Sequence, residues 1–183
     1  MVYILLAPGF EETEALVPAD VLRRGGVPVA LTGLFGSTVS GAHNITVTAD
    51  LTVDQVTLAA GDMVMIPGGP GHARVEESEA ALALARQAAG DDSLWLSAIC
   101  AAPTVLARMG LLTGKQAVCY PGMEDLLTAN GVTARMECSV VRDGRFISGR
   151  APGSAFDFAL AMLETLAGPE AAERLRADMH YGA

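Results

Sequence analysis

The sequence is poor in positive charge. Its 183 residues include 12 lysines and arginines against 21 aspartates and glutamates, which gives a formal net charge of -9. A protein that binds nucleic acid without regard to sequence needs a basic face to neutralise the phosphates. We therefore expect no nucleic-acid partner.

Long hydrophobic runs are also missing. No apolar stretch reaches the roughly 18 residues that a membrane-spanning helix needs. The chain opens directly on a predicted strand, without the basic and apolar segments of a signal peptide. We expect a cytoplasmic protein with no membrane partner.

Cysteine and histidine are scarce, with three of each. Cys100, Cys119 and Cys138 are an odd number without CxxC spacing, which is typical of reduced intracellular thiols rather than of a disulfide framework or a zinc site. No histidine is paired closely with a cysteine along the chain. We expect no metal and no cofactor.

Strand-like apolar runs alternate with helix-like segments along the whole chain, and hydrophobic residues make up 51% of it, enough for one core. This alternation predicts an α/β sandwich, a mostly parallel sheet covered on both faces, in a single domain over 1–183. The expected strands are 2–7, 27–31, 45–48, 63–66, 94–99, 116–119 and a hairpin of 140–142 with 145–147 around Asp143-Gly144; the expected helices are 11–24, 79–89, 101–109, 123–129, 155–166 and 170–179.

Cys100 ends the apolar run that begins at Leu94, and a predicted helix with Pro103 in its first turn follows at once. Such an elbow lifts the side chain out of the sheet and places the sulfur at the positive end of a helix, where a thiolate is favoured. The alternative for a cysteine is a buried, unreactive thiol. The elbow favours a reactive cysteine.

An acidic cluster opens the first predicted helix. The helix dipole by itself explains Glu11 and Glu12 as well as any function does. Glu14 differs, because it shares a stripe with Val17 and Val21 that is expected to face the core. A carboxyl group there has a raised pKa and can donate a hydrogen bond to a thiolate.

A glycine-rich run, PGGPG at 67–71, follows the predicted central strand. No Lys-Ser/Thr pair follows it, so a nucleotide phosphate loop is not indicated. A simple break between strand and loop is one interpretation. The other is that Gly68 and Gly69 allow a close backbone approach to Cys100 at the ligand-binding edge of the sheet, with the amides of Gly69 and Ala101 stabilising an oxyanion.

Four segments, in this order and spacing, resemble the ThiJ/PfpI superfamily, and more narrowly the branch typified by the Parkinson's disease protein DJ-one: APGFEETE at 7–14, IPGG at 66–69, AICAAP at 98–103 and RAPGS at 150–154. The resemblance covers essentially the whole chain. It implies a flavodoxin-like three-layer sandwich, usually a homodimer, with Cys100 at a nucleophile elbow and Glu14 hydrogen-bonded to it. It also matches Gly69 and Ala101 to the family's oxyanion donors and Arg24 to an arginine near the pocket.

The sequence departs from the family pattern at three positions. Tyr120 stands where the human-type member has histidine, so a Cys-His dyad is not supported, and Tyr120 is expected to shape the pocket or to donate a hydrogen bond. His43 replaces a pocket-edge arginine, which weakens the inference of an anionic substrate. Ala101 replaces the histidine of protease and amidotransferase relatives, which leaves His72 as the nearest histidine by motif that could reach Cys100.

The resemblance implies a cofactor-free glyoxalase or deglycase acting on α-oxoaldehydes such as methylglyoxal. Cys100 would add to the aldehyde, the amides of Gly69 and Ala101 would hold the oxyanion, and Glu14 would carry protons between the two carbons to give lactate. One alternative is an oxidative-stress sensor or chaperone whose Cys100 is oxidised to a sulfinate. A cysteine hydrolase is the other, and it requires a histidine near Cys100.

Overall fold

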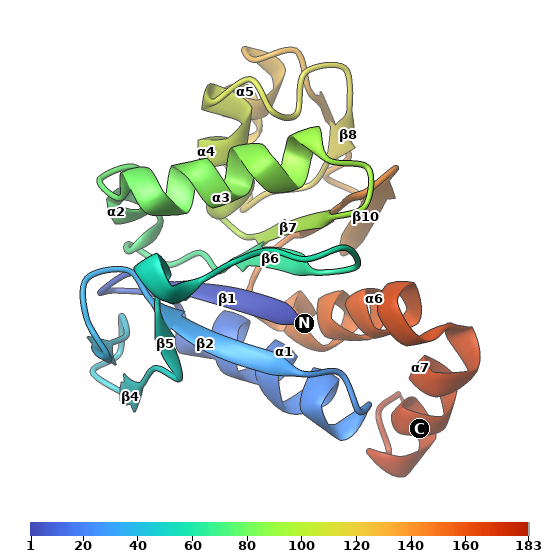
Figure 1. Ribbon diagram of the computed structural model, residues 1–183. Helices are drawn as coiled ribbons and strands as arrows, with labels where there is room; N and C mark the ends of the chain where they lie inside the picture. Colours follow the sequence, from blue (N-terminus) through green and yellow to red (C-terminus); the bar gives the residue numbers. More distant parts are fainter. Residues whose placement is uncertain (183) are drawn as a thin grey trace.

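The computed structural model of the protein describes residues 1–182, which form a seven-stranded sheet between two layers of helices (Figure 1). The strand order is β10-β11-β7-β6-β1-β2-β5, and every neighbouring pair is parallel except β10 with β11. The predicted α/β sandwich is confirmed. The strands are β1 (Val2–Leu6), β2 (Val29–Gly33), β3 (Thr38–Ser40), β4 (Thr46–Thr48), β5 (Leu51–Thr52), β6 (Met63–Ile66), β7 (Trp95–Ile99), β8 (Gln116–Ala117), β9 (Thr133–Ala134), β10 (Val140–Asp143) and β11 (Phe146–Gly149).

Two helical layers bury the sheet on both sides. Helices α1, α6 and α7 cover one face, and α3 and α4, with α5 outside them, cover the other (Figure 1). The helices are α1 (Glu12–Arg24), α2 (His72–Val75), α3 (Glu79–Gly90), α4 (Ala102–Arg108), α5 (Glu124–Thr128), α6 (Ala155–Ala167) and α7 (Pro169–Asp178), with 3-10 turns η1 (Val53–Gln55) and η2 (Pro152–Ser154). Within the described residues, no helix combines the length and apolarity that crossing a bilayer requires.

Strand β1 shows why the predicted strands are continuous apolar runs. Ile4 and Leu6 belong to the core beneath α1 and α6, whereas Tyr3 and Leu5 belong to the core beneath α3 and α4. Successive side chains of a strand point to opposite faces. A strand covered on both faces is therefore apolar at every position, without alternation.

The hairpin of β10 and β11 is present, but its predicted turn was wrong by one residue. Asp143 pairs with Phe146, so the two loop residues are Gly144 and Arg145, not Asp143 and Gly144. Gly144 has φ +58° at the first loop position. Glycine tolerates that left-handed conformation without strain, so it decides where the chain turns.

Strand β2 begins two residues later than predicted. The amide of Val27 donates to the carbonyl of Leu22, which completes the end of α1, and Pro28 has no amide hydrogen. Neither residue donates an amide hydrogen to the neighbouring strand, although the carbonyl of Pro28 accepts the amide of Val2 at 2.8 Å. The prediction also missed β3, β5, β9, α2, η1 and η2, because segments of two to four residues are too short to show periodicity.

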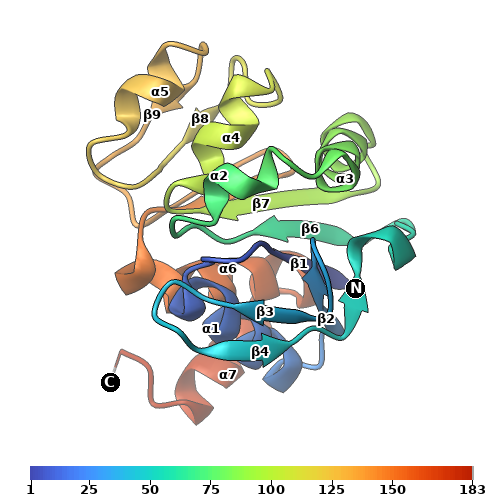
Figure 2. The ribbon, with the colours of Figure 1, turned by 90° about the vertical axis from the view of Figure 1, so that its left-hand side faces the viewer.

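The carboxyl ends of three neighbouring strands create the functional edge of the molecule. Strands β7, β6 and β1 are adjacent and parallel, and they lead into the elbow at Cys100, the glycine run at 67–71 and the start of α1 (Figure 2). Three segments far apart in sequence therefore meet at one edge, the place where ligands bind in open α/β sheets.

Candidate active site

Cys100 occupies a strained elbow between β7 and α4. Its φ of +64° lies in the left-handed region that residues other than glycine seldom adopt. Two long-range hydrogen bonds hold this conformation: the amide of Cys100 donates to the carbonyl of Gly149 (2.9 Å), and the amide of Tyr120 donates to the carbonyl of Cys100 (2.8 Å). The neighbouring strand and loop thus stabilise a backbone geometry that presents the sulfur above the sheet.

Glu14 reaches the sulfur from the first turns of α1. Its side chain is fully buried, and its Oε2 accepts a hydrogen bond from the amide of Gly68 at 2.8 Å. Interaction with the Cys100 thiol lowers the pKa of this carboxyl group, against the larger effect of burial. Oε1 has no hydrogen-bond partner among the described residues. A buried carboxylate oxygen without a donor is costly, so this environment favours the protonated acid.

The two acidic groups are coupled. Burial raises the pKa of Glu14 to about 7. Burial and the negative charge of an ionised Glu14 raise the pKa of the Cys100 thiol to about 12, while the amides of Gly69 and Ala101, which face the sulfur, lower it. At a pH between these two pKa values, Glu14 and Cys100 together hold one proton. When that proton is on Glu14, the sulfur is a thiolate that accepts hydrogen bonds from the carboxylic acid and from two amides.

The expected lowering of the Cys100 pKa by the helix end was therefore wrong. Burial and the Glu14 carboxylate together outweigh the two amides that face the sulfur. A thiolate at neutral pH depends on Glu14 holding the proton, and not on the helix end alone.

The cleft above Cys100 has a volume of about 280 Å³. The structure brings Cys100, Gly69, Ala101 and Tyr120 to this cleft, whereas Glu14 and Gly68 lie behind the sulfur. Tyr120 is at the rim, 47% exposed. The residues that line the cleft are Glu11, Gly69, Pro70, His72, Cys100, Ala101, Tyr120 and Pro152.

Besides Pro70, two lining residues, Glu11 and Pro152, had no predicted role in the site. Glu11 was explained equally well as a helix-end carboxylate. Pro152 belongs to the fourth motif, at 150–154, which was not assigned a function. Both residues lie within segments that carry the family resemblance. Their position in these motifs is the sequence signal that could have identified them as site residues.

Arg24 does not belong to the cleft of this chain, so its predicted place near the pocket was wrong. It lies ten residues beyond Glu14 on α1, about 15 Å further along the helix axis. Its exposed side chain pairs with Asp20, with 2.7 Å between Nε and Oδ2. The rigid helix that brings Glu14 to Cys100 carries Arg24 away from it.

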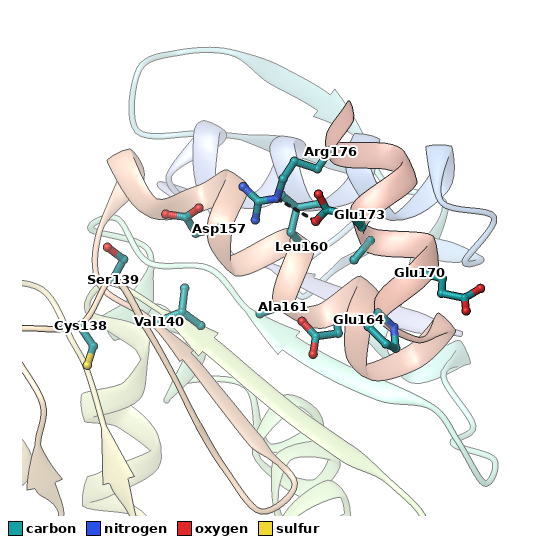
Figure 3. A pocket seen from close by; sticks show the side chains of 12 residues that line it. Cys138, Ser139, Val140, Asp157, Leu160, Ala161, Glu164, Glu170, Glu173 and Arg176 are labelled. Carbon is teal, nitrogen blue, oxygen red and sulfur yellow. Dashed lines mark ion pairs between the residues drawn. The ribbon is translucent and has the colours of Figure 1, made fainter. Parts of the chain in front are cut away.

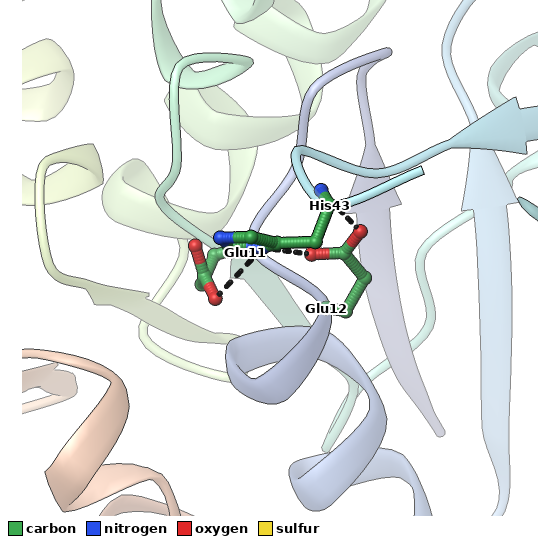
Figure 4. A group of neighbouring side chains, drawn as sticks. All are labelled: Glu11, Glu12 and His43. Carbon is green, nitrogen blue, oxygen red and sulfur yellow. Dashed lines mark hydrogen bonds and ion pairs between the residues drawn. The ribbon is translucent and has the colours of Figure 1, made fainter. Parts of the chain in front are cut away.

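His43 forms a cluster with Glu11 and Glu12 beside the cleft (Figure 4). Its Nδ1 lies 2.8 Å from Glu12 Oε2 and 3.6 Å from Glu11 Oε1, and its amide donates to Glu12 Oε1 at 2.7 Å. These hydrogen bonds outweigh the effect of burial and leave the pKa of Glu12 below its ordinary value. Both oxygens of Glu12 are engaged, so the cluster fastens the loop at 41–45 to α1 rather than offering free metal ligands.

A second hollow is a groove of about 790 Å³ between β10, α6 and α7, larger than the cleft above Cys100 (Figure 3). Cys138 is at one end, and on the α7 wall Arg176 and Glu173 form a loose ion pair along the helix, with 3.9 Å between Nε and Oε2. It holds no pair of buried titratable groups. The coupled Cys100 and Glu14 make the smaller cleft the candidate active site.

Gly68 is a position of the site that leaves no room for a side chain. A Cβ there would lie 2.6 Å from the Cβ of Cys100 and 2.7 Å from Glu14 Oε2. We expect Gly68→Ala to lower the free energy of unfolding by about 1–3 kcal/mol, the usual cost of overpacking. Gly90→Ala is the matched control, because a Cβ at the end of α3 meets no atom within 4 Å. Urea denaturation of both variants checks this, and equal stabilities would contradict the close packing at Gly68.

Comparison with known proteins gives consistent matches. The DJ-1/PfpI family profile matches residues 1–165. The chain is 41% identical over 170 residues to Protein dj-1beta of Drosophila melanogaster, covering 91% of this chain and 89% of that protein. It is 36% identical over 168 residues to the glutathione-independent glyoxalase DJR-1.2 of Caenorhabditis elegans, covering 91% and 89%.

Two further matches complete the comparison. Deglycase PH1704 of Pyrococcus horikoshii is 32% identical over 155 residues, covering 85% of this chain and 92% of that protein. The crystal structure of Drosophila melanogaster DJ-1beta superimposes with a TM-score of 0.92 at 36% identity, covering 100% of this chain and 98% of that one.

Proposed function

This chain belongs to the DJ-1/PfpI family, and from that premise we propose that it is a cofactor-independent enzyme of the glyoxalase or deglycase type, which converts small α-oxoaldehydes through Cys100. The observation that carries the proposal is the buried Glu14 carboxyl group against the Cys100 thiol, with a pKa raised to about 7. Such a group can release and take up a proton at neutral pH. Relatives named glyoxalase and deglycase support this reaction class.

The first step forms a bond between the sulfur and the aldehyde carbon. The thiolate of Cys100 attacks C1 of methylglyoxal, the carbonyl electron pair moves to O1, and the proton of Glu14 neutralises O1 to give a hemithioacetal. The amides of Gly69 and Ala101, which already face the sulfur, lie where they can hold the charge that develops on O1.

The next steps move hydrogen from C1 to C2. Glu14, now a carboxylate, removes the hydrogen of C1, the electron pair forms the C1=C2 bond of an enediol, and O2 takes a proton from solvent. Glu14 then returns its proton to C2 while O1 releases its own, which gives the lactate thioester of Cys100. Water hydrolyses this thioester to lactate and restores the thiolate and the acid.

The charge of the cleft favours uncharged substrates. Glu11 is the one acidic residue among those that line it, and none of the lining residues is lysine or arginine. A carboxylate at the wall repels anions, and the His43 ring, with 3.6 Å between its Nδ1 and Glu11 Oε1, offsets part of this charge when it is protonated. We therefore favour neutral dicarbonyls over α-oxoacids as substrates.

The proposal is tested by incubating the protein with methylglyoxal without glutathione and following lactate by NMR. We expect turnover well above that of buffer containing an equal concentration of a small free thiol. A pure redox sensor would give no lactate, although its Cys100 would still oxidise under mild peroxide. That result would overturn the enzymatic proposal.

Tyr120 is expected to matter little for this reaction. A phenol is a poor general base at neutral pH, and the place of Tyr120 at the exposed rim suits shaping the cleft or donating a hydrogen bond. We expect Tyr120→Phe to keep lactate formation within roughly tenfold of the wild type, about 1.4 kcal/mol of barrier. Steady-state kinetics check this. A loss of several thousandfold would show that the tyrosine does the work of the histidine that relatives carry there.

A further inference from the structure

His72 is a second titratable group of the cleft, and the mechanism above does not use it. It is the first residue of α2, directly after the glycine run, and its half-buried side chain lines the same cleft as Cys100. Glu14, in contrast, approaches the sulfur from the protein interior, where its carboxyl group is fully buried. His72 and Glu14 therefore lie on different sides of the Cys100 sulfur.

One hydrogen bond defines the orientation and tautomer of the His72 ring. Its Nδ1 lies 2.8 Å from the carbonyl oxygen of Gly69, which also accepts the amide of His72 at 3.0 Å. A carbonyl oxygen only accepts, so Nδ1 carries the hydrogen of the neutral ring. Nε2 is then left with its lone pair, which is the form of imidazole that acts as a base.

The same short segment holds the donor that faces the sulfur. The amide of Gly69 is directed at Cys100, while the carbonyl of Gly69 anchors His72. Gly69 has φ +78°, and a Cβ there would lie 2.5 Å from the amide nitrogen of Glu11. This tightly packed turn therefore places a base and an oxyanion donor in fixed relation to one sulfur.

The other lining groups are poor candidates for activating water. Tyr120 is a phenol, and Glu11 faces His43, with 3.6 Å between Oε1 and Nδ1. An acyl group on Cys100 needs a base on the open side of the cleft, because water attacks its carbonyl carbon from there.

We propose that His72 is the general base that hydrolyses acyl groups bound to Cys100, so that the cleft has a thioesterase half-reaction of its own. Nε2 takes a proton from water as the water oxygen bonds to the acyl carbon, and the carbonyl electron pair moves to the oxygen held by Gly69 and Ala101. The pair then returns, the bond between carbon and sulfur breaks, and the thiolate leaves. The carboxylic acid loses its proton to solvent, as does the imidazolium.

In the proposed function, the acyl group that His72 hydrolyses is the lactate thioester of Cys100, so this natural substrate rests on that proposal. The test of His72 does not depend on it. Acetylation of Cys100 with p-nitrophenyl acetate places a simple acyl group on the sulfur, and intact-mass spectrometry follows its loss. This assay tests His72 even if the protein makes no lactate from methylglyoxal. Failure of the two proposals is therefore distinguishable.

The informative variant is His72→Asn, whose amide can still donate to the Gly69 carbonyl but provides no base at neutral pH. We expect one acetyl group on Cys100, as in the wild type, but deacylation slower by about 100-fold. The wild-type rate should fall at acidic pH as the imidazole is protonated, and the variant should lack this fall. Added imidazole should restore deacylation in His72→Ala.

His180→Asn is the matched control. His180 is exposed, lies outside the cleft and has φ +53°, a conformation that asparagine tolerates well. It should deacylate at the wild-type rate. The proposal is overturned if His72→Asn deacylates as fast as this control, or if no variant forms acetyl-Cys100. It is also overturned if His72→Asn deacylates more slowly than the wild type by the same factor at every pH, so that its rate still falls at acidic pH.

Discussion

The Cys100→Ser variant should form lactate from methylglyoxal at least about 1,000-fold more slowly than the wild type, which corresponds to about 4 kcal/mol of barrier. A serine hydroxyl is far less acidic than a thiol, and a carboxyl group such as Glu14 is too weak a base to ionise it. Serine has nearly the same shape, so the fold should be retained. The measurement is lactate formation under saturating methylglyoxal, with the unfolding transition of each variant recorded alongside.

Cys138→Ser is the control for this change. Cys138 is partly exposed and lies outside the cleft, so the same replacement there should leave turnover at the wild-type level. If Cys100→Ser keeps activity within tenfold of the wild type, Cys100 is not the nucleophile and the proposed reaction fails at its first step.

The Glu14→Gln variant should lose about 100- to 1,000-fold in turnover, the range that general acid–base groups commonly contribute. The glutamine amide can accept the hydrogen bond from the Gly68 amide and donate one to the sulfur, so the geometry should persist. It cannot release and regain a proton, which the transfer from C1 to C2 requires. The exposed Glu164→Gln on α6 is the matched control and should retain activity. Wild-type kinetics in Glu14→Gln would remove Glu14 from the mechanism.

The same variant should change how stability depends on pH. In the folded protein burial holds the pKa of Glu14 at about 7, against an ordinary value of 4.5. As the pH rises through this window, the unfolded chain has lost the proton and the folded protein still holds it, so the free energy of unfolding falls with pH. A shift of this size corresponds to about 3 kcal/mol.

Glutamine does not titrate, so the variant lacks this fall. The stability of Glu14→Gln relative to the wild type should therefore rise by up to about 3 kcal/mol between pH 4.5 and pH 8. Urea denaturation of both proteins at these two pH values checks the sign and the size. A constant difference would show that the Glu14 carboxyl group titrates normally in the folded protein.

Local features of the sequence predicted six of the seven strands of the main sheet, all but the two-residue β5, and most helices. The start of α3 is an example: Ser78 directly precedes the predicted helix 79–89, and its Oγ accepts the amide of Ala81 at 3.3 Å. The elbow at Cys100 and the inward direction of Glu14 were also predicted, because both follow from patterns within about ten neighbouring residues. Parallel strands then bring their carboxyl ends to one edge.

What the sequence by itself determined is therefore the layered α/β fold and the edge at which Cys100, Glu14 and the glycine run meet. Only the tertiary structure decided the proton balance of Cys100, the removal of Arg24 from the cleft and the entry of His72 into it. The physical reason is the separation along the chain over which each effect acts. Apolar periodicity and caps act between residues near in sequence, whereas a pKa, a side-chain direction and a cleft wall depend on which groups distant in the chain pack together.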